Sequence, residues 1–295
     1  MIDDNNYPNY FVAGDTTSKK AQFWYIRLFG LDLLLMVLSA ILSVYNYQTE
    51  ESKNIVYLIS GILLLLAMLI SIFLKAKKYE DVWYRGRALA ESCKTLTWRF
   101  IMSSEYFETN IPKEEADRRF IQRIREINNE FSDLNNILSP KQLNLPIITN
   151  EMERVRNLSL NDKKAYYLNN RIQNQINWYS SKAEDSKLKY DVWFLVIIIL
   201  QFLALISIGF LIKYPSSDYN FVGVFSTIAA SGFSWLQVKK YQENKEAYTT
   251  ANSELNLIKA EGNKNFSENE FSEYVLDSEN AMSREHTMWL AQKRM

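Results

Sequence analysis

The sequence has 295 residues, of which 47% are hydrophobic and 23% charged, and its 34 Lys and Arg balance 34 Asp and Glu. This balance gives no reason to expect nucleic acid as a partner, because net charge forces no basic face. A single cysteine, Cys93, excludes an internal disulfide, and a single histidine, His286, excludes a His-based metal cluster. The common phosphate-binding and hydrolase motifs are absent from the sequence. We therefore expect no enzyme, no cofactor and no metal.

The charged residues are distributed very unevenly, because four apolar stretches together carry only one of them, Asp32. A helix needs about 20 apolar residues to cross a hydrocarbon core of about 30 Å. The fourth stretch is the shortest and is rich in Ser, Thr and Gly, but it closely follows a strong span. We predict an all-α integral membrane protein whose four spans are Leu28–Tyr47, Ile55–Leu74, Val192–Ile212 and Phe221–Val238.

Short connectors join these spans in pairs. Gln48–Asn54 and Lys213–Asn220 are too short to hold a domain, so each pair is predicted to form a transmembrane helical hairpin. Lys and Arg are frequent near the open ends of both hairpins, whereas the connectors carry only Lys53 and Lys213. The positive-inside rule then predicts a multi-pass protein of the cell membrane with both termini in the cytoplasm.

Outside the spans the sequence predicts long cytoplasmic helical extensions. From Lys75 the helical pattern runs on without a Gly-Pro break, and we expect the second span to continue as one helix to about Phe107. Pro140 and Pro146 break the pattern and mark a linker. The predicted organisation is an N-terminal tail (1–22), a first unit (23–138), the linker (139–150) and a second unit (151–295).

Two spans carry polar or small residues along one helix face. Such residues line an aqueous path in some membrane proteins, and in others they allow helices to pack closely. Asp32 favours a functional role, since an ionisable group at membrane depth is costly. We leave pore lining and inter-span packing as alternatives for Asp32, Ser39, Ser43, Gly223, Thr227, Ser231 and Ser234.

The cytoplasmic segments present a further set of aromatic and charged residues at helical spacing. They form either a regulatory surface that contacts a sensor or a face that packs helices together. These candidates are Trp83, Arg87, Glu91, Lys94, Trp98, Arg171, Gln175, Trp178, His286 and Trp289.

Three strings resemble one known family. WYRGRALAESCKTLTWRF at 83–100 resembles the post-membrane helix of the SLATT family, a two-transmembrane effector domain associated with SMODS and SLOG proteins. VRNLSLNDKKAYYLNNRIQNQINWYSSKA at 155–183 and REHTMWL at 284–290 resemble a second SLATT subtype. The resemblance spans about residues 23–290 as two SLATT units in series.

The resemblance implies a membrane effector of a bacterial conflict or anti-phage system, which acts in abortive infection. It implies a homo-oligomer that opens a pore or otherwise disrupts the membrane when a nucleotide-synthesising or nucleotide-sensing partner protein triggers it. A membrane-anchored signalling or scaffold module without a pore is the alternative. A membrane enzyme is a third hypothesis, for which Asp32 alone is too little.

Overall fold

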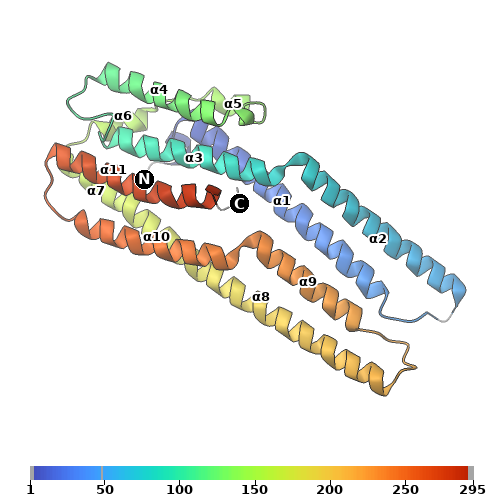
Figure 1. Cartoon of the computed structure of the whole chain (residues 1–295). Helices are drawn as coiled ribbons and strands as arrows, with labels where there is room; N and C mark the ends of the chain where they lie inside the picture. The colour runs from blue at the N-terminus through green and yellow to red at the C-terminus, as the bar shows by residue number, and fades with distance from the viewer. Residues whose placement is uncertain (1–2, 48, 292–295) are drawn as a thin grey trace. The chain divides into compact units, whose positions relative to one another are not determined.

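The structure is a computed structural model that describes residues 3–47 and 49–291, without the side chains of 5 and 284–291. Every regular element in this part of the chain is helical, which confirms the predicted all-α class. Figure 1 labels the α-helices. In chain order the elements are η1 (Asp4–Asn6), α1 (Asn9–Leu42), α2 (Glu50–Lys77), α3 (Tyr79–Ile101), α4 (Lys113–Glu130), η2 (Ser132–Leu134), α5 (Pro140–Leu143), α6 (Asn150–Arg156), α7 (Leu160–Tyr167), η3 (Leu168–Ile172), α8 (Gln173–Lys213), α9 (Val222–Lys239), α10 (Tyr241–Glu261) and α11 (Glu268–Ala291).

The chain divides into two compact units, and each of them is built from both halves of the sequence. The hairpin unit comprises 23–79 and 184–245, and the polar unit comprises 1–22, 80–183 and 246–295. This division runs across the units 23–138 and 151–295 that we predicted along the sequence, and the predicted tail 1–22 belongs to the polar unit.

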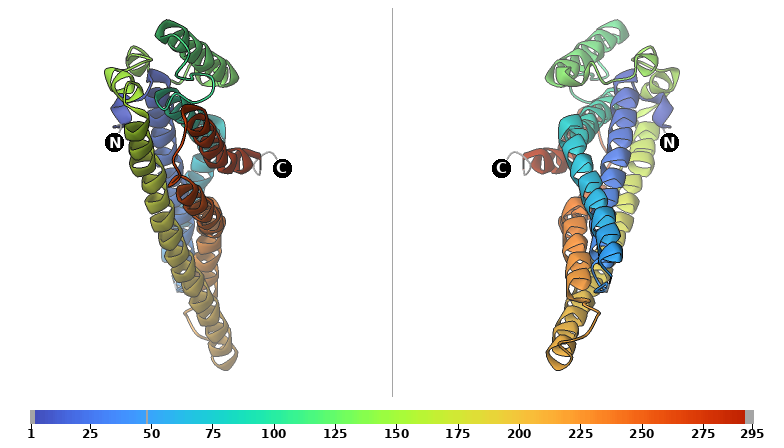
Figure 2. Two further views of the ribbon diagram at one scale, coloured as in Figure 1. Left: turned by 90° about the vertical axis from the view of Figure 1, so that its left-hand side faces the viewer. Right: turned by 90° about the vertical axis from the view of Figure 1, so that its right-hand side faces the viewer.

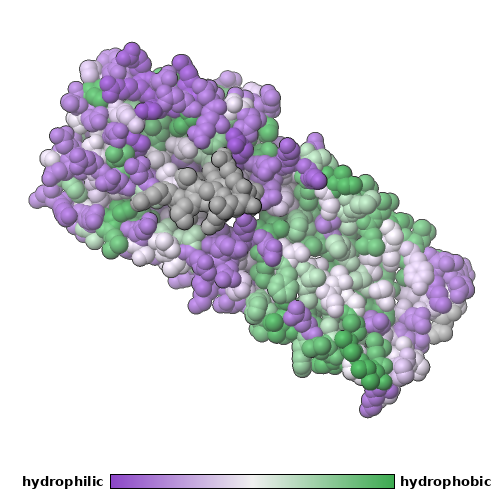
Figure 3. All heavy atoms as spheres, in the orientation of Figure 1, coloured by the Kyte–Doolittle hydropathy of each residue, from purple (hydrophilic) through white to green (hydrophobic). Residues whose placement is uncertain are grey.

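The hairpin unit exposes its apolar side chains. Leu58, Phe202 and Ile212 are 65%, 62% and 77% exposed, and the hydrophobic colouring covers this unit in Figure 3. A soluble protein rarely shows so large an apolar surface, which is suited to lipid. Three helical stretches of the described chain, 9–42, 50–101 and 160–213, are long and apolar enough to cross a membrane. The predicted fourth span forms the 18-residue helix α9, which is not among those three.

The first predicted span is shorter than expected, because α1 ends at Leu42 instead of Tyr47. The chain beyond α1 runs extended so that Tyr45 pairs with Tyr219 in an isolated antiparallel bridge. A backbone that makes these hydrogen bonds to another segment cannot continue the helical ladder. The second and third predicted spans lie within α2 and α8.

Each hairpin ends in the same three-residue sequence, Lys-Lys-Tyr, at 77–79 and 239–241. The middle lysine of each, Lys78 and Lys240, has a left-handed backbone with φ of 49° and 48°. Its N–H still donates to the carbonyl four residues earlier, which closes α2 or α9 before the next helix begins. The prediction of one continuous helix from the second span to Phe107 is therefore wrong: the helix breaks at Lys78, and α3 ends at Ile101.

The polar unit has a continuous apolar core. Its largest fully buried side chains include Trp98, Phe100, Phe107, Phe120 and Tyr167. The helix α4 lies at one edge of this unit (Figures 1 and 2). It is amphipathic, because Ala116, Phe120 and Ile124 at i, i+4 and i+8 are buried while its charged residues are exposed or half-buried.

Within the polar unit, α1 and α3 cross with almost no side chain between them. A Cβ added to Gly14 would lie 3.0 Å from the Gly86 carbonyl oxygen, and one added to Gly86 would lie 3.0 Å from that of Gly14. Near this crossing the Ser18 hydroxyl donates to the Trp83 carbonyl at 2.9 Å. The two glycines therefore set the spacing of these helices.

Candidate functional site

Two buried polar residues in the apolar part of α1, Asp32 and Ser39, contact α2 of the same hairpin. Asp32 is 8% exposed and hydrogen-bonds the side chain of Ser71. Ser39 is equally buried, and its hydroxyl donates to the Ser60 carbonyl at 3.5 Å. Ser43 is exposed, and its hydroxyl donates at 2.7 Å to a carbonyl of its own helix. Asp32 and Ser39 thus stabilise the packing of α1 on α2, and pore lining stays a prediction for all three candidates.

The polar stripe of α9 lies beside the face that packs on α8. Gly232, which we did not single out from the sequence, lies directly against α8, since an added Cβ would be 2.9 Å from the Ile197 side chain. The buried residues of α9 are Val224, Ala229, Gly232 and Leu236. The predicted stripe is exposed or half-buried at Gly223, Thr227, Ser231 and Ser234. Its role in lining a pore or packing spans stays a prediction.

The connectors of the two hairpins are joined by backbone hydrogen bonds, which the sequence did not indicate. The Asn46 N–H donates to the Asp218 carbonyl at 2.6 Å, and the Asn220 N–H donates to that of Val44 at 2.7 Å. Between these bonds the rings of Tyr45 and Tyr219 lie 5.1 Å apart. Both connectors therefore lie at the same end of the hairpin unit.

The polar unit buries a hydrogen-bonded aromatic pair next to a cation. The Trp98 Nε1–H donates to the Tyr7 hydroxyl at 2.9 Å, and both side chains are almost completely buried. The Arg171 guanidinium lies 5.7 Å from the centre of the Trp98 ring. Trp98 and Arg171 were both singled out from the sequence, and the structure brings them together.

Arg171 forms a buried two-point ion pair with Glu279, which the sequence did not indicate. Its Nε and Nη2 donate to the two Glu279 carboxylate oxygens at 2.9 and 2.7 Å, and Glu279 is 0% exposed. The Tyr167 hydroxyl donates to the same carboxylate at 3.0 Å. Burial disfavours the charge on Arg171, but attraction to Glu279 outweighs it and raises the pKa of the guanidinium. Both carboxylate oxygens of Glu279 are therefore hydrogen-bonded. We call the cluster of Tyr7, Trp98, Tyr167, Arg171 and Glu279 the buried junction.

A π-helical turn positions the cationic side of the junction. This turn, η3 (Leu168–Ile172), joins α7 to α8 and contains Arg171. Tyr167 immediately precedes this turn. Burial of the Tyr167 phenol raises its pKa, and the negative charge of nearby Glu279 raises it further. The junction is a closed structural contact, because its groups are bonded to one another and not open to a substrate.

A second charged network links α1 and α3 in the polar unit. Asp15 accepts ion pairs from Lys19 at 2.6 Å and from Arg87 at 3.6 Å. Arg87 also pairs at 2.7 Å with Glu91, which lies four residues later on the same helix. The Asp15 side chain is only 11% exposed, so this network holds the two helices together more firmly than a pair on an open surface.

Lys94 on α3 allows a test of how the burial of a charged amine changes the stability of the polar unit. Burial lowers the pKa of its ammonium, attraction to Glu91 offsets part of the lowering, and Arg171 and Arg87 add to it. Lys94→Met is therefore expected to raise the thermal unfolding midpoint at pH 7 by a few degrees. At a pH below the lowered folded-state pKa, the amine is charged in both the folded and the unfolded chain, and the full free-energy cost of burying the charge applies. This cost decreases as the pH rises from the folded-state pKa toward 10.5, the unfolded-state pKa.

The measurement is thermal unfolding of the purified chain in detergent at pH 7 and pH 9.5. The gain from Lys94→Met should be larger at the lower pH. An unchanged or lowered midpoint at pH 7 would contradict the expected cost of burying this amine.

The other candidates of the polar unit have varied surroundings. Trp83 stacks on Tyr84 with ring centres 4.6 Å apart. Trp178 remains 38% exposed, although its ring lies 5.3 Å from that of Tyr248. Gln175 is half-buried. His286 and Trp289 were also candidates, and their side chains lie outside the described residues.

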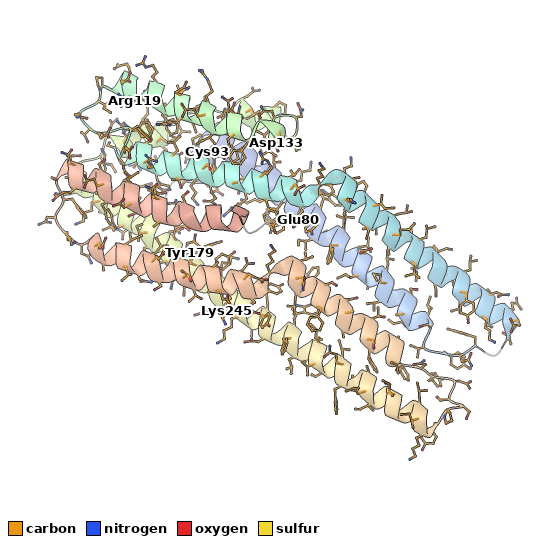
Figure 4. The ribbon with its side chains drawn as sticks, viewed as in Figure 1. Glu80, Cys93, Arg119, Asp133, Tyr179 and Lys245 are labelled. Carbon is orange, nitrogen blue, oxygen red and sulfur yellow. The ribbon has the colours of Figure 1, made fainter. Side chains whose placement is uncertain are left out.

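Two cations that the sequence did not single out hold the turn after α3. Arg156 donates to the Phe107 carbonyl at 2.8 Å and to the Ser103 hydroxyl at 3.3 Å. Lys163 donates to the same hydroxyl at 2.8 Å. Burial lowers the pKa of both Arg156 and Lys163. Their positive charge near the last turn of α3 complements the helix dipole, so we assign them a structural role. Figure 4 shows Cys93 on the same helix, where it is buried.

Comparison with known families identifies both halves of the chain. Residues 8–164 match SMODS and SLOG-associating 2TM effector domain 3, SLATT_3, and residues 167–289 match effector domain 1, SLATT_1. The chain belongs to the SLATT family. It is a tandem of two SLATT domains, as predicted, and SLATT domains are two-transmembrane effector domains associated with conflict systems. A search of curated proteins and a search of solved structures gave no match.

The two SLATT domains meet at the buried junction of the polar unit. The first matched range includes Trp98, whereas Tyr167, Arg171 and Glu279 belong to the second. The matched ranges meet at residues 164–167, whereas we predicted a linker at 139–150. The Arg171–Trp98 contact is therefore a contact between SLATT domains.

Proposed function

We propose that this tandem SLATT protein is a membrane effector of a bacterial conflict or anti-phage system. In this proposal copies of the chain assemble in the cell membrane and open a pore when a nucleotide-synthesising or nucleotide-sensing partner triggers them. The observation that carries it is the pair of effector-domain matches on a chain whose hairpin unit exposes an apolar surface. Opening would depend on a trigger that binds the closed and open states with different affinity.

The proposed topology has four spans and both termini in the cytoplasm. Pairing of Tyr45 with Tyr219 supports it, because both connectors must then lie on one side of the membrane. The fourth span, α9, has 18 residues and is about 27 Å long at 1.5 Å per residue, close to the thickness of the hydrocarbon core. The scarcity of Lys and Arg in the connectors supports the orientation.

A cysteine pair tests this topology. In Tyr45→Cys/Tyr219→Cys the two cysteines replace a non-hydrogen-bonded antiparallel pair, whose Cα atoms are about 4.5 Å apart and suit a disulfide. We expect nearly complete oxidation in intact cells, since the proposed topology places both connectors outside the reducing cytoplasm. Native Cys93 is buried, and burial raises the pKa of its thiol, which keeps it inert.

The readout is protection of the two introduced thiols from a PEG-maleimide, which is lost after reduction. The single variant Tyr45→Cys is the control and should be labelled. Free thiols in both positions of the double variant would contradict the paired, non-cytoplasmic connectors.

The proposed pore would be lined by the partly exposed polar stripe of α9 and by the polar candidates of α1, Asp32 among them. Thr227 is the most informative position of that stripe, because it is half-buried and lies beside the α8-packing face. Asp32 would add a preference for cations if opening released it from Ser71. Both substitutions, Thr227→Leu and Asp32→Asn, leave the apolar outer surface unchanged.

Reconstituted chains provide the functional test. The wild type, activated by its trigger or by high density in the bilayer, should release a small dye from liposomes, and Thr227→Leu should slow release at least severalfold. Asp32→Asn should lower the preference for cations over anions. Leu205→Val, at a 65% exposed apolar position, is the matched control and should behave as the wild type. Equal release and selectivity in all four proteins would reject the pore-lining assignment.

A membrane-anchored signalling or scaffold module is the second candidate. The observation in its favour is that Asp32 and Ser39 are already hydrogen-bonded within the single chain, so neither needs an aqueous path. Insertion without any release of dye at any density would favour this candidate.

A further inference from the structure

The polar unit has an open groove between the second half of α10 and the first half of α11. Its volume is about 440 Å³. Five carboxylates and one ammonium line it, and all six of these residues are exposed. They are Glu254, Glu261, Glu270, Glu273, Asp277 and Lys264.

The floor of the groove is apolar and fixed. The rings of Phe266 and Tyr274 stack with centres 5.0 Å apart, and the Tyr274 hydroxyl donates to the Ile258 carbonyl at 2.9 Å. Leu257 lies at the edge of the groove and is 67% exposed, more than any other large apolar side chain described in the polar unit. An exposed apolar side chain above an apolar floor is typical of a protein-binding groove.

The groove continues past Ala281 into a small crevice. Leu255 and Met282 line that crevice, together with Tyr179 of α8, which Figure 4 labels. The groove and the crevice both include Ile258, so they form one continuous apolar surface with an acidic border.

The charge of the groove selects among ligand classes. Its carboxylates repel phosphate groups, so a free nucleotide or a nucleic acid does not fit. The carboxylates are spread along two helices, and the described residues hold no group of three His, Cys, Asp or Glu side chains that could bind a metal ion. A positively charged segment with apolar side chains complements both the border and the floor.

We infer that this groove docks a basic amphipathic helix of a partner protein. Leu or a similar side chain of that helix packs on Phe266 and Tyr274, and Lys or Arg side chains on either side pair with the carboxylates. This inference rests on the proposed effector function in one respect: the partner that binds the groove is taken to be the protein that triggers this chain. Binding itself can be measured without any membrane leakage.

The test uses the full chain in nanodiscs and a fluorescently labelled 15-residue helical peptide that carries four Lys and two Leu four residues apart. Glu261→Lys/Asp277→Lys should weaken binding by about tenfold or more, which corresponds to about 1.4 kcal/mol. Leu257→Ser should weaken it by a smaller factor. Higher salt should weaken binding by the wild type, because the charges at the border are exposed.

Glu114→Lys/Glu130→Lys on α4 is the matched control, since it makes the same charge change at exposed positions away from the groove. It should bind the peptide within about twofold of the wild type, less than 0.5 kcal/mol. A scrambled peptide with the same charge but no apolar face tests the need for the floor and should bind weakly.

Equal affinity of the groove and control variants would overturn the inference, as would equal binding of the scrambled peptide. A change in the size of the assembly in the groove variant alone, without loss of peptide binding, would assign the groove to a second copy and also overturn it. Loss of dye release with intact peptide binding would reject the pore and leave the groove in place.

Discussion

Replacing Glu279 with glutamine is expected to lower the free energy of unfolding of the polar unit by about 3–5 kcal/mol. Glu279 is fully buried and accepts two hydrogen bonds from Arg171 and one from Tyr167. In Glu279→Gln the guanidinium loses its counter-ion but remains 3% exposed, so it keeps the cost of burial without compensation. The aromatic neighbours Trp98 and Tyr7 provide no full negative charge in its place.

The measurement is thermal and denaturant-induced unfolding in detergent, followed by tryptophan fluorescence. The midpoint should fall by on the order of 10 °C, since 1 kcal/mol moves it by about 2–4 °C in a domain of this size. The matched control is Glu151→Gln, which removes the carboxylate of an ion pair with Arg154 on the surface of α6. That variant should lose at most about 1 kcal/mol.

A double-mutant cycle separates the pair from its surroundings. Arg171→Met/Glu279→Gln removes the buried cation as well, and we expect it to be more stable than the sum of the single variants by about 2–3 kcal/mol. Strictly additive effects would contradict a direct ion pair. An unchanged midpoint in Glu279→Gln would contradict the buried junction between the SLATT domains.

Much of the fold could be predicted from the sequence because the signals are local. An apolar run of 20 residues indicates a membrane span by itself, and α2 and α8 contain the predicted spans. Helical spacing also identified Trp98 and Arg171 as residues on important faces. In each case the information lies within one helix.

The partners of those residues could not be predicted, because they lie far away in the sequence. Tyr7 is 91 residues from Trp98, and Glu279 is 108 residues from Arg171. Neither Tyr7 nor Glu279 stands out in its own segment, since a buried glutamate has the same local pattern as an exposed one. Only the tertiary fold brings these groups into contact.

The helix breaks at Lys78 and Lys240 were missed for a different reason. A left-handed residue that ends a helix is usually Gly or Asn, and lysine gives no such signal. The repeated Lys-Lys-Tyr at 77–79 and 239–241 was the available clue, since it marks corresponding ends of the two hairpins. The pairing of Tyr45 with Tyr219 likewise depends on two connectors that are distant in sequence.

Replacing Gly86 with leucine is expected to destabilise the polar unit by about 1–3 kcal/mol through overpacking. A Cβ at this position would lie 3.0 Å from the Gly14 carbonyl oxygen and 3.1 Å from the Ser18 backbone nitrogen. Both of these are backbone atoms, which no rotamer change can move, so the whole of α1 must shift away from α3. That shift would also weaken the ion pair between Asp15 of α1 and Arg87 of α3, which joins the two helices in the same region.

The same change at Gly61 is the control, because an added Cβ there meets no other atom within 4 Å. Gly61→Leu should leave the midpoint unchanged or raise it, since leucine has a higher helix propensity than glycine by up to about 1 kcal/mol. Gly14→Leu should be as damaging as Gly86→Leu, because the two glycines oppose each other. In the double variant the second leucine should cost less than it does alone, since the helices have already separated. Full additivity, or equal stability of Gly86→Leu and Gly61→Leu, would contradict the close crossing of α1 and α3.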